Sequence, residues 1–570
     1  MFIAFSRSLP SVLAALTHAA LSSLMLLLCA SPATAQEADE PHPVLTANNC
    51  ALCHSNAPRA AAMRDADQRE ISPHGLWSGT MMANSARDPL WRAVLSAEIA
   101  ATPSRQRDIE ATCLRCHAPM ASEVGLDDHT TGSLLHLLRC NSPLGELAID
   151  GVSCTICHGM DPSNLGSDES YSGGYVLDDQ RRLFGPHQGV VTRPMQMHVG
   201  FTPTYSDHVT SSALCGTCHT LETEALDPEG NDLGAVLVEQ APYLEWLNSA
   251  FNDELDAPGP LAASCQDCHM PKHDSDGTPI ETPIARNPGG RDFPFAKPRQ
   301  PFGQHAFVGG NTLVLSMLRD HGEALGVKAT TEALDATIAA TRNQLQTQTA
   351  TLTIREFNRS AQQLTFHVDI GNLTGHKFPT AHPTRRAWLQ VLVRDDDGDL
   401  LFASGRTNAR GQIIDGAGEL LPSELAGGPI EAHHDVVQAS TQVATFESKM
   451  GDIHGEPTHL LLRGASYLKD NRLLPLGWSA DHAEAGRTAT AGVNGDDDFL
   501  PGSDRVHYVV ELPDISPDQQ LTVDVALLYQ PLGARWAAEL FRHDTPEVER
   551  FKTYYKTANL VPEVVATATR

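Results

Sequence analysis

Basic and aromatic side chains are both scarce in this 570-residue chain. Lysine and arginine total 41 against 70 acidic residues, which gives a formal net charge of −29, and 6% of the residues are aromatic. A surface this acidic repels the phosphates of nucleic acids and the headgroups of anionic lipids. The composition therefore argues against nucleic-acid binding. It is compatible with a basic protein partner, although many acidic surfaces are simply solvated.

Long apolar runs are missing beyond the N-terminus. Arg7 is the only charged side chain in the first 35 residues, residues 12–28 are mostly apolar, and Ala33-Thr34-Ala35 follows. This order of charge, apolar run and small residues predicts a secretory signal peptide at residues 1–35. We therefore expect an exported chain, periplasmic or extracellular, with no transmembrane segment after cleavage.

Two kinds of membrane attachment are the alternatives to cleavage. A retained anchor is disfavoured because His18 and several hydroxyl side chains interrupt a run that is already short for a membrane span. A lipid anchor on Cys29 is disfavoured because Leu28 stands where such signals place a small residue.

Cysteine usage carries the main functional information. Ten of the twelve cysteines form five C-x-x-C-H units: Cys50-Cys53-His54, Cys113-Cys116-His117, Cys154-Cys157-His158, Cys215-Cys218-His219 and Cys265-Cys268-His269. This motif attaches c-type haem, because two thiols bond to the porphyrin edge and the following histidine binds the iron. The motifs predict five covalent haems.

Zinc sites and disulfide bonds are the other uses of paired cysteines. Zinc does not require a histidine directly after the second cysteine, and disulfides require none. Here that histidine follows in all five units, which favours haem. Cys140 stands alone, and we expect it to be a buried structural thiol rather than a redox group.

The chain changes character along its length. Residues 36–310 hold all five motifs, with many prolines and glycines, and counting residues 36–345 as the haem region gives about 60 residues per haem. So little polypeptide predicts short helices and loops, such as a helix at residues 88–100, around a core made largely of haem. Apolar spacing then predicts two helices, at 311–325 and 330–348, within a helical spacer at 311–349.

From about residue 350 the apolar period becomes two. Alternation marks strands at 364–370, 506–512 and 521–529, and Asp397-Gly398 predicts a hairpin turn between 389–394 and 400–403. Half-buried strands with such turns favour an immunoglobulin-like β-sandwich at 350–570. The expected fold class is therefore α+β: a multihaem region, a helix pair and a β domain.

Three phrases around the motifs resemble a known family. They are Asp150-Gly-Val-Ser-Cys-Thr-Ile-Cys-His158, Ser211-Ser-Ala-Leu-Cys-Gly-Thr-Cys-His219 with His208 before it, and Ser264-Cys-Gln-Asp-Cys-His-Met-Pro271. They are similar to multihaem cytochromes of the cytochrome c-554 type, and the resemblance implies electron transfer through haem. No motif has lysine in place of histidine. This departs from pentahaem nitrite reductases, whose active-site motif ends in lysine.

The sixth iron ligand separates an electron relay from a catalytic haem. We expect distal ligands at His74, His208, His305 and His376; weaker candidates are His129, His136, His187, His198, His273 and His382. His376 follows a predicted strand at the tip of the β domain, where Phe378 is placed to pack on a porphyrin. Arg385 and Arg386 follow as candidate partners for haem propionates. The alternative is that this segment is an exposed turn.

The sequence thus predicts an exported pentahaem c-type cytochrome that exchanges electrons with redox partner proteins. Two alternatives remain open. One is an oxidoreductase acting on a small nitrogen or sulfur compound at one open haem. The other is a structural subunit of an extracellular cytochrome assembly.

Overall fold

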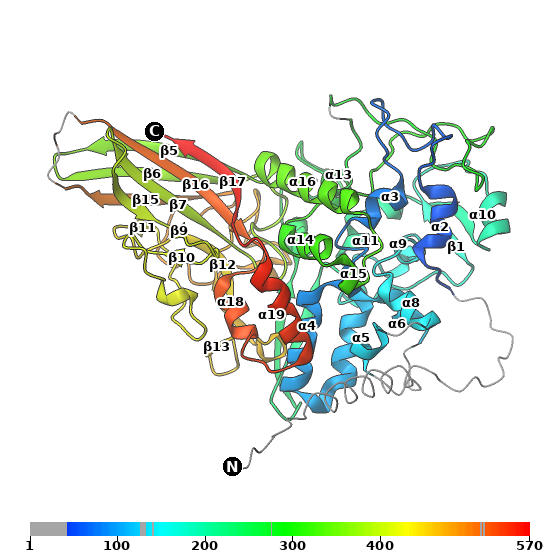
Figure 1. The fold of residues 1–570 in the computed structure, drawn as a ribbon, viewed down its shortest axis with the longest axis horizontal. Helices are drawn as coiled ribbons and strands as arrows, with labels where there is room; N and C mark the ends of the chain where they lie inside the picture. Colours follow the sequence, from blue (N-terminus) through cyan, green and yellow to red (C-terminus); the bar gives the residue numbers. More distant parts are fainter. Residues whose placement is uncertain (1–42, 126–132, 140–141, 275, 514–515, 517–518) are drawn as a thin grey trace, which may run out of the picture.

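The structure, a computed structural model, describes residues 43–125, 133–139, 142–274, 276–513, 516 and 519–570. The predicted signal peptide, Cys140 and His129 lie outside the described residues. Within the described ranges, no helix is long and apolar enough to cross a membrane. Figure 1 shows the motif-bearing helices on one side of the molecule and the large sheets on the other.

The motif-bearing half consists of short helices and loops, as expected. Its longest helix is α4, which begins after Asp88, whose side chain accepts hydrogen bonds from the amides of Leu90 and Trp91. Two small sheets, β1–β2 and β3–β4, complete it. The elements are α2 (Ala47–His54), α3 (Pro73–Ser78), α4 (Pro89–Ala101), α5 (Gln106–His117), α6 (Pro119–Glu123), α7 (Leu134–Leu137), α8 (Pro143–Ile149), α9 (Cys154–Cys157), β1 (Arg182–Gly185), α10 (Arg193–His198), β2 (Thr202–Tyr205), α11 (Ser212–Gly216), β3 (Leu221–Leu226), β4 (Asp232–Gln240), α12 (Pro242–Leu247) and α13 (Cys265–His269).

The two helices predicted next are present, and the first is divided. It runs as α14 (Thr312–Asp320) and α15 (Gly322–Leu325), broken at His321, and Gly326 ends it with a φ of +69°. The second is α16 (Thr331–Gln348), and the Thr330 hydroxyl caps it by accepting the Ala333 amide. Both helices bury the apolar face on which their prediction rested.

The C-terminal part contains two larger sheets. One has the order β11-β15-β6-β5; the other has the order β13-β12-β7-β16-β17, with β14 paired to β12 and β8 to β7. The strands are β5 (Ala350–Arg359), β6 (Gln363–Asn372), β7 (Arg386–Asp395), β8 (Leu400–Ser404), β11 (Val436–Val437), β12 (Thr445–Gly451), β13 (Pro457–Thr458), β14 (Ser466–Asp470), β15 (Ser503–Glu511), β16 (Leu521–Gln530) and β17 (Glu563–Thr569). A short β9–β10 pair (Arg406–Thr407, Ile413–Ile414) lies beside them.

Apolar side chains alternate with polar ones along the strands, and the apolar ones form a shared core between the two sheets. Phe366 and Val368 of β6 and Tyr508 of β15 pack in one buried cluster with Val391 of β7 and Val525 of β16. The α+β fold class is confirmed by these elements. An immunoglobulin-like arrangement of the sheets remains a prediction.

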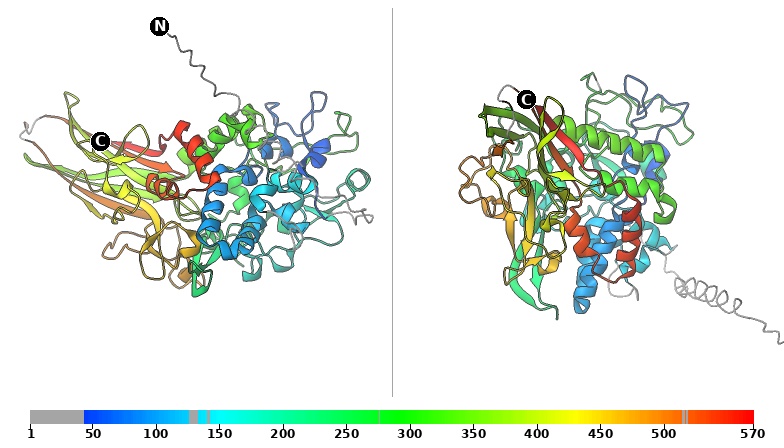
Figure 2. Two further views of the ribbon diagram at one scale, coloured as in Figure 1. Left: turned by 60° about the horizontal axis from the view of Figure 1, so that its bottom comes forward. Right: turned by 60° about the vertical axis from the view of Figure 1, so that its left-hand side comes forward.

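Three helices in the C-terminal part were not predicted. One is the short α17 (Ala485–Thr488), and the other two are α18 (Ala534–Leu540) and α19 (Pro546–Thr557), which interrupt the chain between β16 and β17. The buried side chains of α18 and α19, such as Trp536 and Phe551, form one cluster with Val94 of α4 and Met317 of α14. Figures 1 and 2 show α19 beside α4. The C-terminal part therefore shares a hydrophobic core with the motif-bearing half.

Candidate haem-binding site

Each C-x-x-C-H motif lies on or next to a short helix. His54, His117 and His269 are the last residues of α2, α5 and α13, and His158 directly follows α9. In the fourth motif, Cys215 is in α11 and Cys218 lies in the turn after it. Positions i, i+3 and i+4 of a helical turn lie on one face. Helix formation thus directs both thiols and the imidazole of a motif to the same side.

None of the ten motif cysteines forms a disulfide in the described structure. Instead, thiols of different motifs contact one another in pairs: Cys50 with Cys154, Cys116 with Cys218, and Cys215 with Cys265. Cys157 and Cys218 pack against one apolar cluster, which places the third motif beside the fourth. The five motifs therefore adjoin one another, with the fourth motif next to three others, rather than forming separate sites.

All ten cysteines and all five motif histidines line a single cavity. Its volume is about 2360 Å³, whereas pockets for one small ligand typically have about 300–1,000 Å³. Apolar side chains such as Trp91, Phe184 and Leu214 provide much of the lining. The cavity has the chemistry expected of a site for several large, mostly apolar cofactors.

Hydrogen bonds prepare three of the five motif histidines for metal binding. Nδ1 of His54 is 3.0 Å from the Ile284 carbonyl oxygen, and Nδ1 of His158 and of His269 are each 2.6 Å from a carbonyl, of Phe184 and Val308 respectively. A carbonyl only accepts, so the proton sits on Nδ1 and the lone pair of Nε2 is free. Metal-binding histidines commonly have such a partner. Burial also lowers the pKa of these rings, which keeps them neutral as ligands must be.

Two predicted distal ligands face motif histidines across the cavity. The ring centre of His305 lies 6.1 Å from that of His158, with 24° between the planes, and His376 lies 6.3 Å from His269 at 15°. Two metal–nitrogen bonds of about 2 Å each, together with the distance from nitrogen to ring centre, add to about 6 Å. Both separations therefore match two imidazoles on opposite sides of one iron.

The rings of His305 and His376 also carry their proton on Nδ1, which leaves Nε2 free to bind a metal. Nδ1 of His305 is 3.2 Å from the Gly303 carbonyl oxygen, and Nδ1 of His376 is 2.9 Å from that of Lys377. Burial lowers the pKa of His305 to about 3 and that of His376 to about 4. The residues present thus fit haem iron with two histidine ligands at the third and fifth motifs.

The other two predicted distal ligands are placed differently. His74 lines the cavity with its ring 5.8 Å from that of Trp77. His208 is not among the cavity-lining residues: its Nδ1 is 2.7 Å from the Ser206 hydroxyl and its Nε2 is 3.0 Å from the Met160 carbonyl oxygen. The structure does not bring His208 to an iron position. Among the described residues, His54, His117 and His219 have no facing histidine of the kind seen for His158 and His269.

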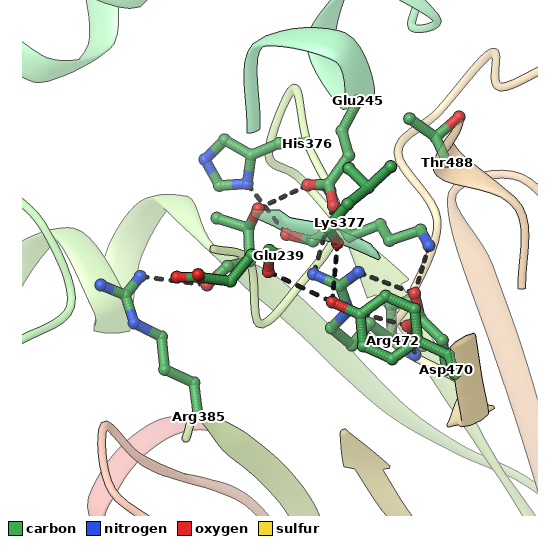
Figure 3. Close-up of polar contacts among 12 residues, drawn as sticks. Glu239, Glu245, His376, Lys377, Arg385, Asp470, Arg472 and Thr488 are labelled. Carbon is green, nitrogen blue, oxygen red and sulfur yellow. Dashed lines mark hydrogen bonds and ion pairs between the residues drawn. The ribbon is translucent and has the colours of Figure 1, made fainter. Parts of the chain in front are cut away.

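A buried charge network fixes the loop that carries His376 (Figure 3). The ammonium of Lys377, 1% exposed, lies 2.7 Å from an Asp470 carboxylate oxygen, and Arg472 pairs with the same carboxylate at 2.7 Å. Glu245, from α12 of the motif-bearing half, accepts the Lys377 amide at 3.0 Å and pairs with Arg472 at 3.2 Å. Burial alone would raise the pKa of Asp470, but the charges of Arg472 and Lys377 hold it well below its usual range.

The two arginines predicted to pair with haem propionates have different surroundings. Arg385 lines the cavity and donates to the Thr380 carbonyl at 3.0 Å. Arg386 is buried in a bidentate ion pair with Glu424 and also binds Gln530. The predicted pairing of Arg386 with a haem propionate was therefore wrong, because strand β7 turns this side chain away from the cavity. Phe378 lines the cavity, but it also packs in the sheet core, 5.8 Å from the Tyr529 ring.

A group of ionisable side chains lines the cavity near the second motif. The Trp91 ring stacks on His117, with 4.5 Å between ring centres. Burial raises the pKa of Glu98 to about 7 and that of Glu239 to about 8. Burial also raises the pKa of the Cys113 thiol, and the two nearby carboxylates raise it further. Sequence reasoning missed the two glutamates, because nothing in an isolated glutamate indicates that it is buried.

His382 belongs to the same group but is in the opposite tautomer. The Thr384 amide donates to its Nδ1 at 3.3 Å, so the proton is on Nε2, which lies 3.9 Å from Glu239. A protonated Nε2 donates a hydrogen bond and does not bind a metal. Burial lowers the pKa of His382 to about 3, so the ring is neutral and offers Nε2 as a hydrogen-bond donor rather than as an iron ligand.

No protein-family model matches the chain, and no curated protein matches it. Among solved structures, a penta-heme cytochrome c552 from Thermochromatium tepidum is similar to it, with 17% sequence identity and a TM-score of 0.47 over 93% of this chain and 100% of that one.

Proposed function

We propose that the chain is an exported c-type cytochrome that transfers electrons through five covalently bound haems. The observation that carries this proposal is the arrangement of the five motifs. Their thiols and histidines open into one cavity, and two of the five histidines face a second histidine at the spacing of a six-coordinate iron.

The residues have defined roles in this proposal. The ten motif cysteines form the thioether bonds, and His54, His117, His158, His219 and His269 are the proximal iron ligands. His305 and His376 are the distal ligands of the third and fifth haems. His74 is the candidate for a further iron. Bound haem would supply reversible one-electron chemistry, and saturation with two histidines favours relay over substrate binding.

Two further parts of the proposal, export and a basic redox partner, are motivated by the sequence. The predicted signal peptide would bring the chain to the compartment where haem is attached, and its acidic composition suits a basic redox partner. N-terminal sequencing of the mature protein from a periplasmic fraction tests export. The expected first residue is Gln36; an intact Met1, or a protein confined to the cytoplasm, contradicts it.

A spectroscopic redox titration tests electron transfer. The reduced protein should show c-type absorption bands, and titration should resolve several one-electron steps, because neighbouring motifs are in contact and their haems interact. Low-spin signals should dominate the oxidised spectrum. A protein without reversible redox steps, or with mostly high-spin iron, contradicts the relay function.

The alternative is reduction or oxidation of a small nitrogen or sulfur compound at the second haem. The observation that favours it is the group Glu98, Glu239, His382 and Arg385 on the cavity wall near His117, which offers both proton donors and a cation. Nitric oxide binding to the untreated protein tests it. Binding at one haem, lost in His117→Ala, with turnover of nitrite, hydroxylamine or sulfite, would favour the enzyme over the relay; no binding would favour the relay.

A further inference from the structure

Two segments of this acidic chain are basic. Residues 181–200 contain three arginines and no acidic residue, and residues 284–300 contain four basic residues and one aspartate. Of these, Arg193, Arg291 and Lys297 are exposed, and none of the three has an ion-pair partner in the described part of the chain. On a chain with a net charge of −29, unpaired cations in one place create a local field opposite in sign to that of the rest of the surface.

Both basic segments lie beside haem motifs. The carbonyl that fixes the His54 ring belongs to Ile284, and the carbonyl that fixes the His158 ring belongs to Phe184. Figure 1 shows α2, which ends at His54, and also β1 and α10 at the end of the molecule farthest from the large sheets. The basic segments are therefore next to the first and third motifs, at the outer end of the motif-bearing half.

One side chain joins the two segments into a single surface. The Arg299 guanidinium donates to the carbonyl oxygens of Gln188 at 2.8 Å and Gly189 at 3.1 Å. Val191 and Phe295, one from each segment, line the cavity that holds the motifs. The joined surface thus extends up to the proposed haem sites.

The outer part of this surface combines positive charge with an apolar side chain. Met197 of α10 is 75% exposed. Neither Met197 nor the cations Arg193 and Arg291 line the cavity, so haem bound in the cavity would not cover them. An apolar contact surrounded by unpaired charge is typical of surfaces on which partners associate rapidly and briefly.

We infer that the surface formed by residues 181–200 and 284–300 docks an acidic redox protein, which exchanges electrons at the first motif. One electron passes between the cofactor of the partner and the iron bound by His54, so that one is oxidised as the other is reduced, and no bond is made or broken. A relay needs both a donor and an acceptor, and the acidic remainder of the chain suits the basic one. The inference rests on the proposed function and adds a second partner of opposite charge.

Stopped-flow reduction of the haem-loaded protein by reduced flavodoxin, an acidic electron-transfer protein, tests this surface. The rate constant should fall as NaCl is added, because salt screens the attraction. The double variant Arg193→Glu with Arg291→Glu should react about tenfold more slowly at low salt, whereas Lys556→Glu, which reverses an exposed charge on α19, should react as the wild type does. A rate that rises with salt, or an unchanged rate in the double variant, would overturn the inference.

A small reductant separates this inference from the proposed function. Reduced methyl viologen, which needs no docking surface, should reduce the wild type and the double variant alike. A protein that neither reductant reduces would contradict the proposed function, and this inference with it.

A second variant and two binding assays complete the test. Met197→Glu places a negative charge within the same surface and should also slow the flavodoxin reaction; an unchanged rate would count against the inference. Binding to vesicles of anionic phospholipid would assign the surface to a membrane, and a dimer that dissociates in the double variant would assign it to a second copy of the chain. Either result would overturn the assignment to an acidic redox protein.

Discussion

Hydrogen bonds at Nδ1 separate the proposed iron ligands of the third and fifth motifs from His382 in this cavity. His158, His269, His305 and His376 all direct Nδ1 at a backbone carbonyl, whereas His382 accepts an amide there. The tautomer is thus set by the backbone around each ring. This explains why the motif histidines were evident from the sequence, whereas the distal histidines were only candidates. The motif itself marks a proximal histidine, but only the folded chain shows which carbonyl oxygen lies next to a distal one.

Replacement of one distal ligand tests this assignment. In His376→Ala, one of the five haems should change from low to high spin, bind carbon monoxide and gain a higher potential, because a strong donor is lost. His208→Ala is the matched control, since both ring nitrogens of His208 have partners away from the cavity. Electron paramagnetic resonance and carbon monoxide difference spectra measure both. An unchanged spectrum in His376→Ala would show that the ligand is another residue.

The buried glutamate near the second motif predicts a pH effect. An unfolded glutamate titrates near pH 4.3, while the pKa of Glu239 is about 8 in the folded chain. Between these values the unfolded state releases a proton that the folded state keeps, so stability falls as the pH rises. Glu239→Gln should therefore raise the melting temperature at pH 8 much more than at pH 5. The exposed Glu419→Gln serves as control; equal effects at both pH values would contradict the buried, protonated state.

Among the elements, those with a regular apolar period were predictable. β6, β15, β16, α14 and α16 lie close to their expected positions because their regularly spaced apolar side chains are buried, those of the strands between the sheets and those of the helices in the clusters around α14. α18 and α19 were missed, although Thr545, Pro546 and the spacing of Val548, Phe551 and Tyr555 are typical of a helix start and an apolar face. The surrounding strands had suggested a continuous sheet domain.

The loop between β6 and β7 depends on its buried charges. Asp470→Asn would leave Lys377 and Arg472 without their shared carboxylate, which should cost about 3–5 kcal/mol of stability. It should also broaden the spectrum of the haem bound by His269, because His376 would lose its fixed position. Chemical denaturation followed by haem absorption measures the first effect, with Asp396→Asn as control. A loss below about 1 kcal/mol would contradict the account of the network.

For the molecule as a whole, the motif-bearing half and the sheets are packed together through a shared apolar core. α4, α14, α18 and α19 share one apolar cluster, and Glu245 joins the two parts through charge. This contact could not be read from the sequence, because each helix shows an apolar face but not the partner that covers it. At about 60 residues per motif, we expect the motif-bearing half to bury too few apolar side chains to fold without the proposed haems.

Loss of one attachment site should consequently reduce folding as well as haem content. Cys154→Ala with Cys157→Ala removes the third attachment site, whose Cys154 thiol contacts Cys50 of the first motif. We expect a low yield of folded protein and increased proteolysis. The wild type, expressed with and without the haem-attachment machinery, is the control. A stable apoprotein of native mass and circular dichroism would contradict this view.

The number of haems per chain tests the central claim most directly. Intact mass spectrometry of the purified mature protein, combined with a haem assay under denaturing conditions, should give the polypeptide from Gln36 plus five covalently attached haems. The mass of the bare polypeptide, with disulfide bonds or with zinc in place of haem, would contradict the account.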